Sequence, residues 1–352
     1  NDSDNWEDIM EVLDKKGGLL LQASAGNGKT YVAKQIAKKL MEKGYGVKII
    51  APTNKAGLNI GGSTIHKFLK IDKEGNISSK LLKIIKEKYQ YIIIDEISMI
   101  GKELWKRINL LKINSNIKFL LLGDEKQCPP VENEDIEDYF NHPAVKSICN
   151  YNRNVLDVRK RYDEKLYNIL EDVNNIKIDY AHAIKEPLTE RNICYYNKTR
   201  KRINKYWNDK KKNDKDLFIP ADEENDKTQD MYIYEGLPVI AMKTKHDGDN
   251  ILFANSETFN VGNIDNEYIS LCCERPDENG EKEMYIYDCL IEDFRDYFLL
   301  NYCSTTHKSQ GETITEEYTI YDWDGMTTKI KYTALSRAVK YENVYFGYGE
   351  RE

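Results

Sequence analysis

The chain has 352 residues, about twice the size of a common single domain, so we expect two compact units. Its 52 Lys and Arg against 59 Asp and Glu give a net charge of −7, which argues against a generally basic coat protein for nucleic acid. No apolar run approaches the roughly 18–20 residues of a membrane span, so we expect no membrane partner. No basic-then-apolar leader opens the chain, so we expect a protein that is not secreted. Its expected location is intracellular, in the nucleus, the cytoplasm or a viral replication site.

The charge is unevenly distributed along the chain. Residues 1–150 hold 23 basic and 20 acidic side chains, whereas the remainder holds 29 and 39. A basic groove in the first half is therefore compatible with the negative total. The seven cysteines are odd in number and form no C-x-x-C pair, so the sequence predicts reduced thiols and neither a disulfide framework nor a zinc site.

The first half alternates short apolar runs with segments of helical spacing. Helical spacing covers Tyr31–Lys43 and Lys102–Leu111, and the apolar runs that end in polar residues are Gly18–Gln22, Val47–Ala51, Tyr91–Asp95 and Phe119–Asp124. This alternation predicts an α/β fold with a parallel sheet and flanking helices. Since ligands of such sheets bind beyond the carboxyl ends of the strands, the polar ends of these runs are the predicted functional residues.

The second half begins with a strand-like run at Asn192–Tyr196, and further strand-like runs occur at Tyr297–Cys303 and Asn343–Tyr348. Residues 231–290 are rich in Tyr, Val and Ile and contain turn pairs such as Asp247-Gly248, so they are predicted to form strands. The basic stretch Lys198–Asp216 is typical of a solvated helix face, and we do not assign it to a binding site.

A phosphate-binding loop follows the first apolar run, at Ala23–Thr30. Small residues let backbone N–H groups turn towards phosphate oxygens, the Lys29 ammonium reaches the β and γ phosphates, and the Thr30 hydroxyl binds Mg²⁺. Ala23 stands where the strict pattern has its first glycine. The predicted nucleotide-binding residues are Ala25, Gly26, Asn27, Gly28, Lys29 and Thr30.

Polar residues at the ends of two further runs complete this predicted site. Asp95 is expected to hold the Mg²⁺ shell and Glu96 to polarise the attacking water. Gln127 is expected to bridge the γ-phosphate and that water. The alternatives are an Asp-Glu cap of a helix at residues 98–112 and a Gly-Asp turn before a proline-rich loop. The pairing with Lys29 and Thr30 favours the catalytic interpretation.

These pieces occur in the order found in superfamily 1 helicases, and the chain resembles superfamily 1B DNA helicases of the Pif/RecD/Dda type. The residues that carry the resemblance to motifs I to VI are Ala23–Thr30, Ala51–Gly57 with Asn59–Phe68, Asp95–Met99, Gly123–Gln127 with Pro129-Pro130, Arg161–Leu166, Tyr195–Asn204, Ser304–Thr313 and Tyr332–Ala338. They span nearly the whole chain.

The resemblance implies two RecA-like P-loop domains, each a parallel sheet with flanking helices. The first would span residues 1–150, with a small wedge insertion at about 69–90. The second would span 151–352 and carry a small Src-homology-like β-barrel at 231–290. ATP and Mg²⁺ would be the cofactors. Arg337 would act as an arginine finger, with Arg161 as a second catalytic arginine and Arg153 and Arg159 as rivals for that role.

The resemblance also implies 5′→3′ translocation on single-stranded DNA and unwinding of forked duplex DNA, with other replication proteins or further domains of the same chain as partners. Hydroxyl, amide and ammonium groups suit DNA phosphates, and flat rings suit bases. The predicted DNA-binding residues are Thr53, Asn54, Lys55, His66, Phe68, Thr306, His307 and Lys308. For His66 and Phe68, packing within the protein is the alternative.

Three other functions stay open from the sequence. A superfamily 1 RNA helicase shares Gly-Asp-x-x-Gln and Leu-Ser-Arg. A P-loop kinase or nucleotide switch would leave residues 300–340 without a purpose. An ATPase-inactive single-strand-binding module of a larger replication protein is disfavoured by Lys29, Asp95, Glu96, Gln127 and Arg337.

Overall fold

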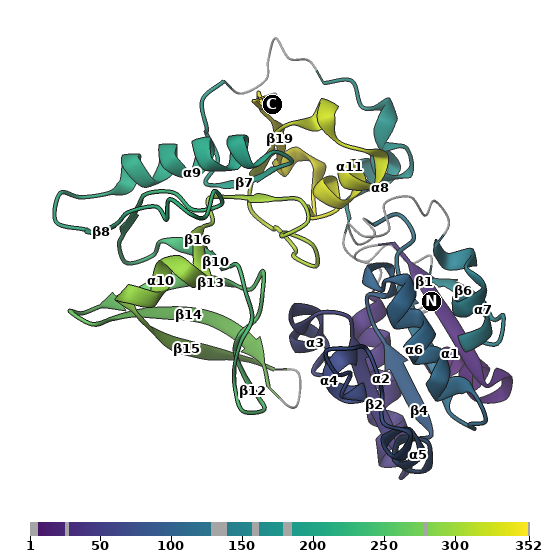
Figure 1. Ribbon diagram of the computed structural model, residues 1–352. Helices are drawn as coiled ribbons and strands as arrows, with labels where there is room; N and C mark the ends of the chain where they lie inside the picture. The colour runs from purple at the N-terminus through teal and green to yellow at the C-terminus, as the bar shows by residue number, and fades with distance from the viewer. Residues whose placement is uncertain are drawn as a thin grey trace. The chain divides into compact units, whose positions relative to one another are not determined.

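The computed structural model describes residues 6–24, 28–127, 139–156, 162–178, 185–277 and 281–350. The chain divides into two compact units, Asn1–Arg161 (unit 1) and Tyr162–Glu352 (unit 2), and each is described by itself (Figure 1). Among the described helices, none is both long and apolar enough to span a bilayer.

Unit 1 is built on a six-stranded, fully parallel sheet in the order β3-β2-β4-β5-β1-β6. β1, β4 and β5 are buried runs rich in Ile and Leu, because helices cover both faces, whereas the outer strand β6 is mostly exposed. The α/β prediction is confirmed, and four of the strands fall on the predicted apolar runs. The strands are β1 (Gly18–Ala23), β2 (Val47–Ala51), β3 (Ser63–Thr64), β4 (Tyr91–Ile94), β5 (Lys118–Gly123) and β6 (Arg153–Leu156).

Two apolar clusters hold helices to opposite faces of this sheet. One contains α1 (Trp6–Lys16), α2 (Lys29–Glu42) and Ile60 of α3 (Asn54–Ile60). The other contains α4 (Ile65–Leu69), α5 (Ser79–Lys88), α6 (Lys102–Lys112) and α7 (Pro143–Ile148). Short 3₁₀ turns occur at η1 (Ile97–Met99) and η3 (Tyr139–Asn141).

Unit 2 contains a second parallel sheet, in the order β17-β7-β18-β19. Around it lie α8 (Glu164–Glu171), η4 (Val173–Asn175), α9 (Asn197–Lys211), η5 (Trp323–Gly325), α11 (Thr328–Leu335) and η6 (Tyr341–Asn343). The four strands are β7 (Arg191–Cys194), β17 (Cys303–Thr305), β18 (Tyr318–Ile320) and β19 (Val344–Phe346).

An antiparallel insertion separates β7 and α9 from β17. Its five-stranded sheet has the order β15-β14-β13-β10-β16, with the hairpin β11–β12 beside it. A second short pair, β8 (Leu217–Ile219) with β9 (Met231–Ile233), precedes it. The elements of the insertion are β10 (Pro238–Ala241), β11 (Lys245–Asp247), β12 (Asn250–Phe253), β13 (Thr258–Ile264), β14 (Tyr268–Pro276), β15 (Lys282–Leu290), α10 (Ile291–Tyr297) and β16 (Phe298–Leu300).

The run Tyr297–Cys303, predicted as one strand, is divided between two sheets. β16 closes the antiparallel insertion against β10, whereas β17 starts the parallel sheet beside β7. Asn301 and Tyr302 lie between them and are buried, so hydropathy alone does not show the break. The Asn301 N–H donates to the Pro238 carbonyl at 2.9 Å, which fixes the point where the chain leaves the insertion.

Candidate functional site

The phosphate loop joins β1 to α2, and its predicted residues Ala25, Gly26 and Asn27 lie outside the described part of the chain. Gly28 has φ +81°, a left-handed conformation that suits glycine, and it forms the N-cap of α2. No side chain caps this helix and its first turn has no acidic residue. The positive end of the α2 dipole therefore suits an anion.

Lys29 and Thr30 occupy the first turn of α2 and are both partly buried. The Lys29 ammonium donates to the Ala23 carbonyl at the end of β1, with Nζ and O 2.8 Å apart. The lysine is therefore folded back over the loop by a bond to a neutral acceptor. An anionic phosphate group can replace that acceptor with a stronger, charge-assisted bond.

Asp95 and Glu96 follow β4, the second strand from β1 in the sheet. The Asp95 carboxylate is 4% exposed and accepts the Glu96 N–H at 2.8 Å. Burial, and next the charge of Glu96, raise the pKa of Asp95 to about 7, while Lys29 and Lys34 oppose the shift. Glu96 itself has φ +51°. A divalent cation would favour the ionised form of this carboxyl.

Gln127 follows β5, which lies between β4 and β1. Its side chain is 5% exposed, and its N–H donates to the Asp124 carbonyl at 3.2 Å. Asp124 is also buried and accepts the Lys126 N–H at 3.0 Å. β1, β4 and β5 are parallel, so their carboxyl ends lie on the same side of the sheet. The ends of the phosphate loop, the Asp95-Glu96 pair and Gln127 follow these carboxyl ends.

Magnesium fits these donors. Mg²⁺ is usually held by one or two protein oxygen ligands together with substrate phosphates. The Thr30 hydroxyl and the Asp95 carboxylate offer such a pair. Among the described residues no cluster of three or more His, Cys, Asp or Glu is placed to hold a metal ion.

The predicted DNA-binding residues of unit 1 differ in their availability. Thr53 caps α3 by accepting the Ala56 N–H at 3.1 Å, and Asn54 and Lys55 are partly buried beside it. His66 is exposed on α4. Phe68 is partly buried, with its ring centroid 5.6 Å from that of Tyr89.

Lys48 lies over the Phe68 ring, with its ammonium 5.5 Å from the centroid. Of the two rings, the His66 imidazole is the freely exposed one, whereas Phe68 already packs within unit 1.

In unit 2, Thr306, His307 and Lys308 follow β17. Thr306 is fully buried and its hydroxyl donates to the Cys194 carbonyl at 3.2 Å, so this side chain joins the ends of β17 and β7. His307 and Lys308 are partly exposed. The Lys308 ammonium donates to Asn255 Oδ1 at 3.0 Å, which connects it to the antiparallel insertion.

Arg337 follows α11 and is 1% exposed. Its guanidinium donates to the Thr333 carbonyl at 3.0 Å, the Ser336 hydroxyl at 3.2 Å and the Ser309 carbonyl at 3.4 Å. No carboxylate among the described residues forms an ion pair with it. A buried guanidinium held only by neutral acceptors retains its attraction for an anion. The other predicted arginine, Arg161, lies outside the described residues, as does its rival Arg159.

The sequence did not predict the role of Asp322, which follows β18. Asp322 is 8% exposed and accepts three hydrogen bonds, from the Tyr195 N–H (3.0 Å), the Tyr196 N–H (3.0 Å) and the Thr199 hydroxyl (2.8 Å). It therefore fixes the start of α9. In the sequence, Asp322 stands out only as an acidic residue that follows a strand. Asp95 has the same position, so this feature does not distinguish a structural acid from a catalytic one.

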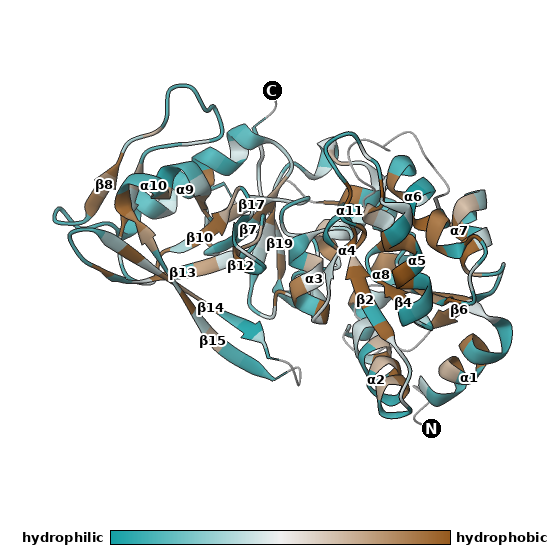
Figure 2. Cartoon of the chain, turned by 60° about the horizontal axis from the view of Figure 1, so that its bottom comes forward, coloured by the Kyte–Doolittle hydropathy of each residue, from teal (hydrophilic) through white to brown (hydrophobic). Residues whose placement is uncertain are grey.

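The basic helix α9 has an exposed face rich in lysine and is largely teal in Figure 2. Acidic residues neutralise much of it, because Lys205 and Lys212 pair with Asp209 and Lys211 pairs with Glu190. Ion pairs of this kind are typical of a solvated surface.

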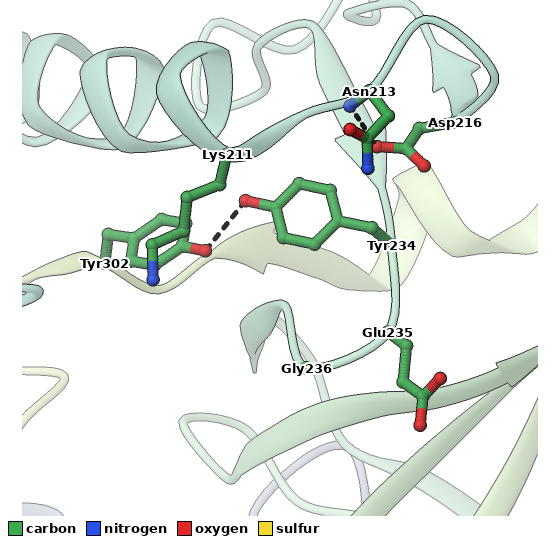
Figure 3. Close-up of a pocket in the computed structure, with 7 residues that line it drawn as sticks. All are labelled: Lys211, Asn213, Asp216, Tyr234, Glu235, Gly236 and Tyr302. Carbon is green, nitrogen blue, oxygen red and sulfur yellow. Dashed lines mark hydrogen bonds between the residues drawn. The ribbon is translucent and has the colours of Figure 1, made fainter.

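A cavity of about 600 Å³ lies in unit 2 at the end of α9 (Figure 3). The Tyr234 and Tyr302 hydroxyls are hydrogen-bonded at 2.7 Å in its wall. Its other lining residues are Lys211, Asn213, Asp216, Glu235 and Gly236. None of the predicted site residues within the described part of the chain lines it.

A phosphate loop at the end of an interior strand of one parallel sheet, with a second parallel sheet in another unit, defines a P-loop protein with RecA-like sheets. Residues 6–146 match a family described as AAA domain. The ATP-dependent DNA helicase PIF1 of Candida albicans is 27% identical over 203 residues, which cover 49% of this chain and 22% of that protein. The Dda helicase of phage T4 is 29% identical over 191 residues, which cover 50% and 42%. The chain thus spans less than half the length of either relative.

Solved structures share the fold over nearly the whole chain. The Candida albicans Pif1 helicase superposes with a TM-score of 0.69 at 20% identity, covering 97% of this chain and 94% of that one. Bacteroides Pif1 bound to single-stranded DNA gives a TM-score of 0.66 at 19% identity, covering 98% and 92%. The homologues of the chain are the Pif1, RecD2 and Dda helicases of superfamily 1B, as its motifs predict.

Proposed function

We propose that the protein is an ATP-dependent DNA helicase that moves 5′→3′ on single-stranded DNA inside the cell and separates forked duplexes. The observation that carries the proposal is the Asp95-Glu96 pair, which lies at the same sheet edge as the phosphate loop and contains a buried carboxyl whose ionisation a cation would favour. Relatives named ATP-dependent DNA helicase support it.

Each residue at the sheet edge receives one role in ATP hydrolysis. Lys29 leaves the Ala23 carbonyl to bind the β and γ phosphates, while Thr30 and Asp95 hold Mg²⁺, which neutralises phosphate charge when bound. Glu96 orients and deprotonates the attacking water, and Gln127 contacts that water and the γ-phosphate. The loop residues Ala25 to Gly28 donate backbone N–H groups.

Arg337 provides the second part of the proposed reaction. As an arginine finger, its guanidinium would exchange a neutral carbonyl acceptor for the γ-phosphate and stabilise the charge of the transition state. Arg161 remains the second candidate for this role.

The DNA contacts are divided between the two units. We propose that Thr53, Asn54 and Lys55 bind phosphates and that His66 stacks on a base, with Phe68 as a supporting ring. In unit 2, His307 and Lys308 contact the strand. We assign Thr306 a positioning role instead, because its buried hydroxyl donates a hydrogen bond to the Cys194 carbonyl. Relatives solved with single-stranded DNA and with forked DNA support these partners.

Unwinding assays on tailed duplexes test the proposal. With ATP and Mg²⁺, the protein should separate a 5′-tailed DNA duplex, and Glu96→Gln should bind the DNA but fail to separate it. Unwinding of only the 3′-tailed substrate would refute the direction. Unwinding of RNA but not DNA would make the protein an RNA helicase, and binding without hydrolysis would make it a single-strand-binding module.

A further inference from the structure

Strand β15 forms an open edge of the antiparallel insertion. It is the outermost strand in the order β15-β14-β13-β10-β16, and it pairs with β14 over nine residues (Figure 1). No backbone hydrogen bond reaches its outer side from any described residue. A long open edge is a template for another strand, and proteins normally shorten, cover or twist such edges.

The backbone groups on this open side belong to the even-numbered residues. At the two ends of the ladder, the Ile291 N–H donates to the Glu267 carbonyl (3.0 Å) and the Asp277 N–H donates to the Glu281 carbonyl (2.7 Å). Residues 281 and 291 therefore bond to the β14 side, and in an antiparallel ladder every second residue does the same. Lys282, Met284, Ile286 and Asp288 thus direct their N–H and C=O groups outward.

The side chains of these residues also share one face. On the opposite face, Tyr285 donates to the Leu252 carbonyl at 2.7 Å and Tyr287 packs on Phe253 with ring centroids 5.2 Å apart, so that face is covered. On the even-numbered face, by contrast, Met284 is 66% exposed and Ile286 57% exposed. Two adjacent apolar side chains therefore flank an unused row of backbone donors and acceptors.

The order of residues in β15 is complementary to itself. When a second copy pairs antiparallel about a two-fold axis at Tyr285, Met284 lies opposite Ile286 of the second copy, and Lys282 lies opposite Asp288. Shifting the axis to Ile286 would set Met284 against Asp288, and shifting it to Met284 would set Lys282 against Ile286. Only the Tyr285 axis, of these three, matches apolar with apolar and cation with anion.

This axis also satisfies the backbone geometry. Every outward-facing even residue meets another even residue, so Met284 and Ile286 form hydrogen-bonded pairs, while Tyr285 meets its own copy in the non-hydrogen-bonded position. An isologous contact of this kind closes at two copies and occupies the β15 edge of both.

We propose that the protein forms a homodimer through antiparallel pairing of β15 with β15 of a second copy, centred on Tyr285. The two insertions then make one continuous sheet. A contact of two nine-residue strands is small, so the dimer is weak, with a dissociation constant on the order of 10 µM. The pairing needs neither nucleotide nor DNA, and it therefore stands or falls independently of the proposed helicase activity.

Sedimentation equilibrium of the full chain, without nucleotide or DNA, measures this dimer from roughly 1 to 200 µM. Ile286→Lys and Met284→Lys should each raise the dissociation constant at least about tenfold, because each places a charge against an apolar partner. Both side chains are exposed, so circular dichroism and the melting temperature should stay unchanged. Lys106→Glu is the matched control, since Lys106 is an exposed, ion-paired lysine of unit 1.

Charge reversal tests the register. In the Lys282→Glu variant, the new Glu lies opposite Asp288 of the second copy. In the Asp288→Lys variant, the new Lys lies opposite Lys282 of the second copy. Like charges then face each other, so each single variant should dimerise several-fold more weakly. An equimolar mixture of these two variants should form heterodimers, and the double variant Lys282→Glu with Asp288→Lys should restore the homodimer. A chain that is monomeric at 200 µM, or a dimer unaffected by Ile286→Lys, or a failure of both rescues, would overturn the proposal.

Discussion

Two aspartates, Asp95 in unit 1 and Asp322 in unit 2, occupy similar positions at the carboxyl ends of parallel strands and are about equally buried, yet their surroundings differ. Asp322 accepts three hydrogen bonds from Tyr195, Tyr196 and Thr199. From the residues that the structure describes, Asp95 accepts one, from the next residue in the chain. Burial alone therefore does not identify a ligand-binding acid. We propose that the acceptor capacity left unused by the described residues distinguishes the two acids, because a buried charge requires partners.

Arg337 extends the comparison to cations. Among the described residues it is buried and donates only to neutral acceptors, as Arg200 also does, but only Arg337 lies in the segment that resembles motif VI. The largest effect is therefore expected from Arg337→Lys, which keeps the charge but loses the planar fork. The turnover number for DNA-stimulated ATP hydrolysis should fall roughly 10³-fold.

Nucleotide affinity separates this role from a structural one. Arg337→Lys should bind a fluorescent ATP analogue within about threefold of the parent, with an unchanged melting temperature. Arg202→Lys, in a half-exposed arginine paired with Glu350, is the control and should hydrolyse ATP normally. Equal losses in the two variants would contradict the assignment.

Lys29→Ala removes the ammonium of the phosphate loop. We expect kcat/KM for ATP to fall roughly 10²- to 10³-fold, because a positioned cation stabilises the phosphate charge that develops during transfer. A coupled phosphate-release assay measures the loss. Lys38→Ala, on the exposed side of the same helix α2, should leave the rate unchanged. Full activity of Lys29→Ala would exclude the loop as the hydrolysis site.

Much of the site was predictable because ligands of parallel sheets bind beyond the carboxyl ends of the strands. β1, β2, β4 and β5 were visible as apolar runs, so the residues that follow them could be located at one edge of a sheet. The hydrogen-bond partners that occupy some of these side chains could not be recognised in the sequence. Thr306 bonds to Cys194, 112 residues away, and Asp322 bonds to residues more than 120 positions earlier. Such long-range contacts have no local pattern.

The second sheet was harder to predict for the same reason. Its strands β7, β17, β18 and β19 have three or four residues each, too short for periodicity to show, and β16 continues directly into the segment before β17. The open edge of β15 is likewise a property of strand order, which depends on pairing rather than on composition.

The free energy of unfolding of Asp322→Asn tests the structural role of Asp322 in the comparison with Asp95. Asn keeps the shape but replaces an ionised acceptor of three hydrogen bonds with a neutral one, so the free energy of unfolding should fall by about 2 kcal/mol. The corresponding drop in melting temperature is roughly 4–8 °C, measurable by calorimetry. Asp324→Asn, two residues away and exposed, should change it little. A stable Asp322→Asn protein would show that the three bonds contribute little.

Asp95→Asn should act in the opposite direction, with a smaller effect. The folded protein raises the pKa of Asp95 from an ordinary value near 3.8 to about 7. Between these values the folded state holds a proton that the unfolded chain has released, so the free energy of unfolding falls as pH rises through this window. Above pH 7 the full penalty of the buried charge is present, and Asn avoids it.

In the absence of Mg²⁺ and nucleotide, Asp95→Asn should therefore melt roughly 2–6 °C higher than the parent at pH 8 and nearly equal to it at pH 4. Differential scanning fluorimetry across that range measures both values. Added Mg²⁺ with ADP should stabilise the parent and not the variant, because the cation turns the buried charge into a ligand. If Asp95→Asn were less stable than the parent at pH 8, Asp95 would be a structural brace like Asp322, and the distinction between the two acids would fail.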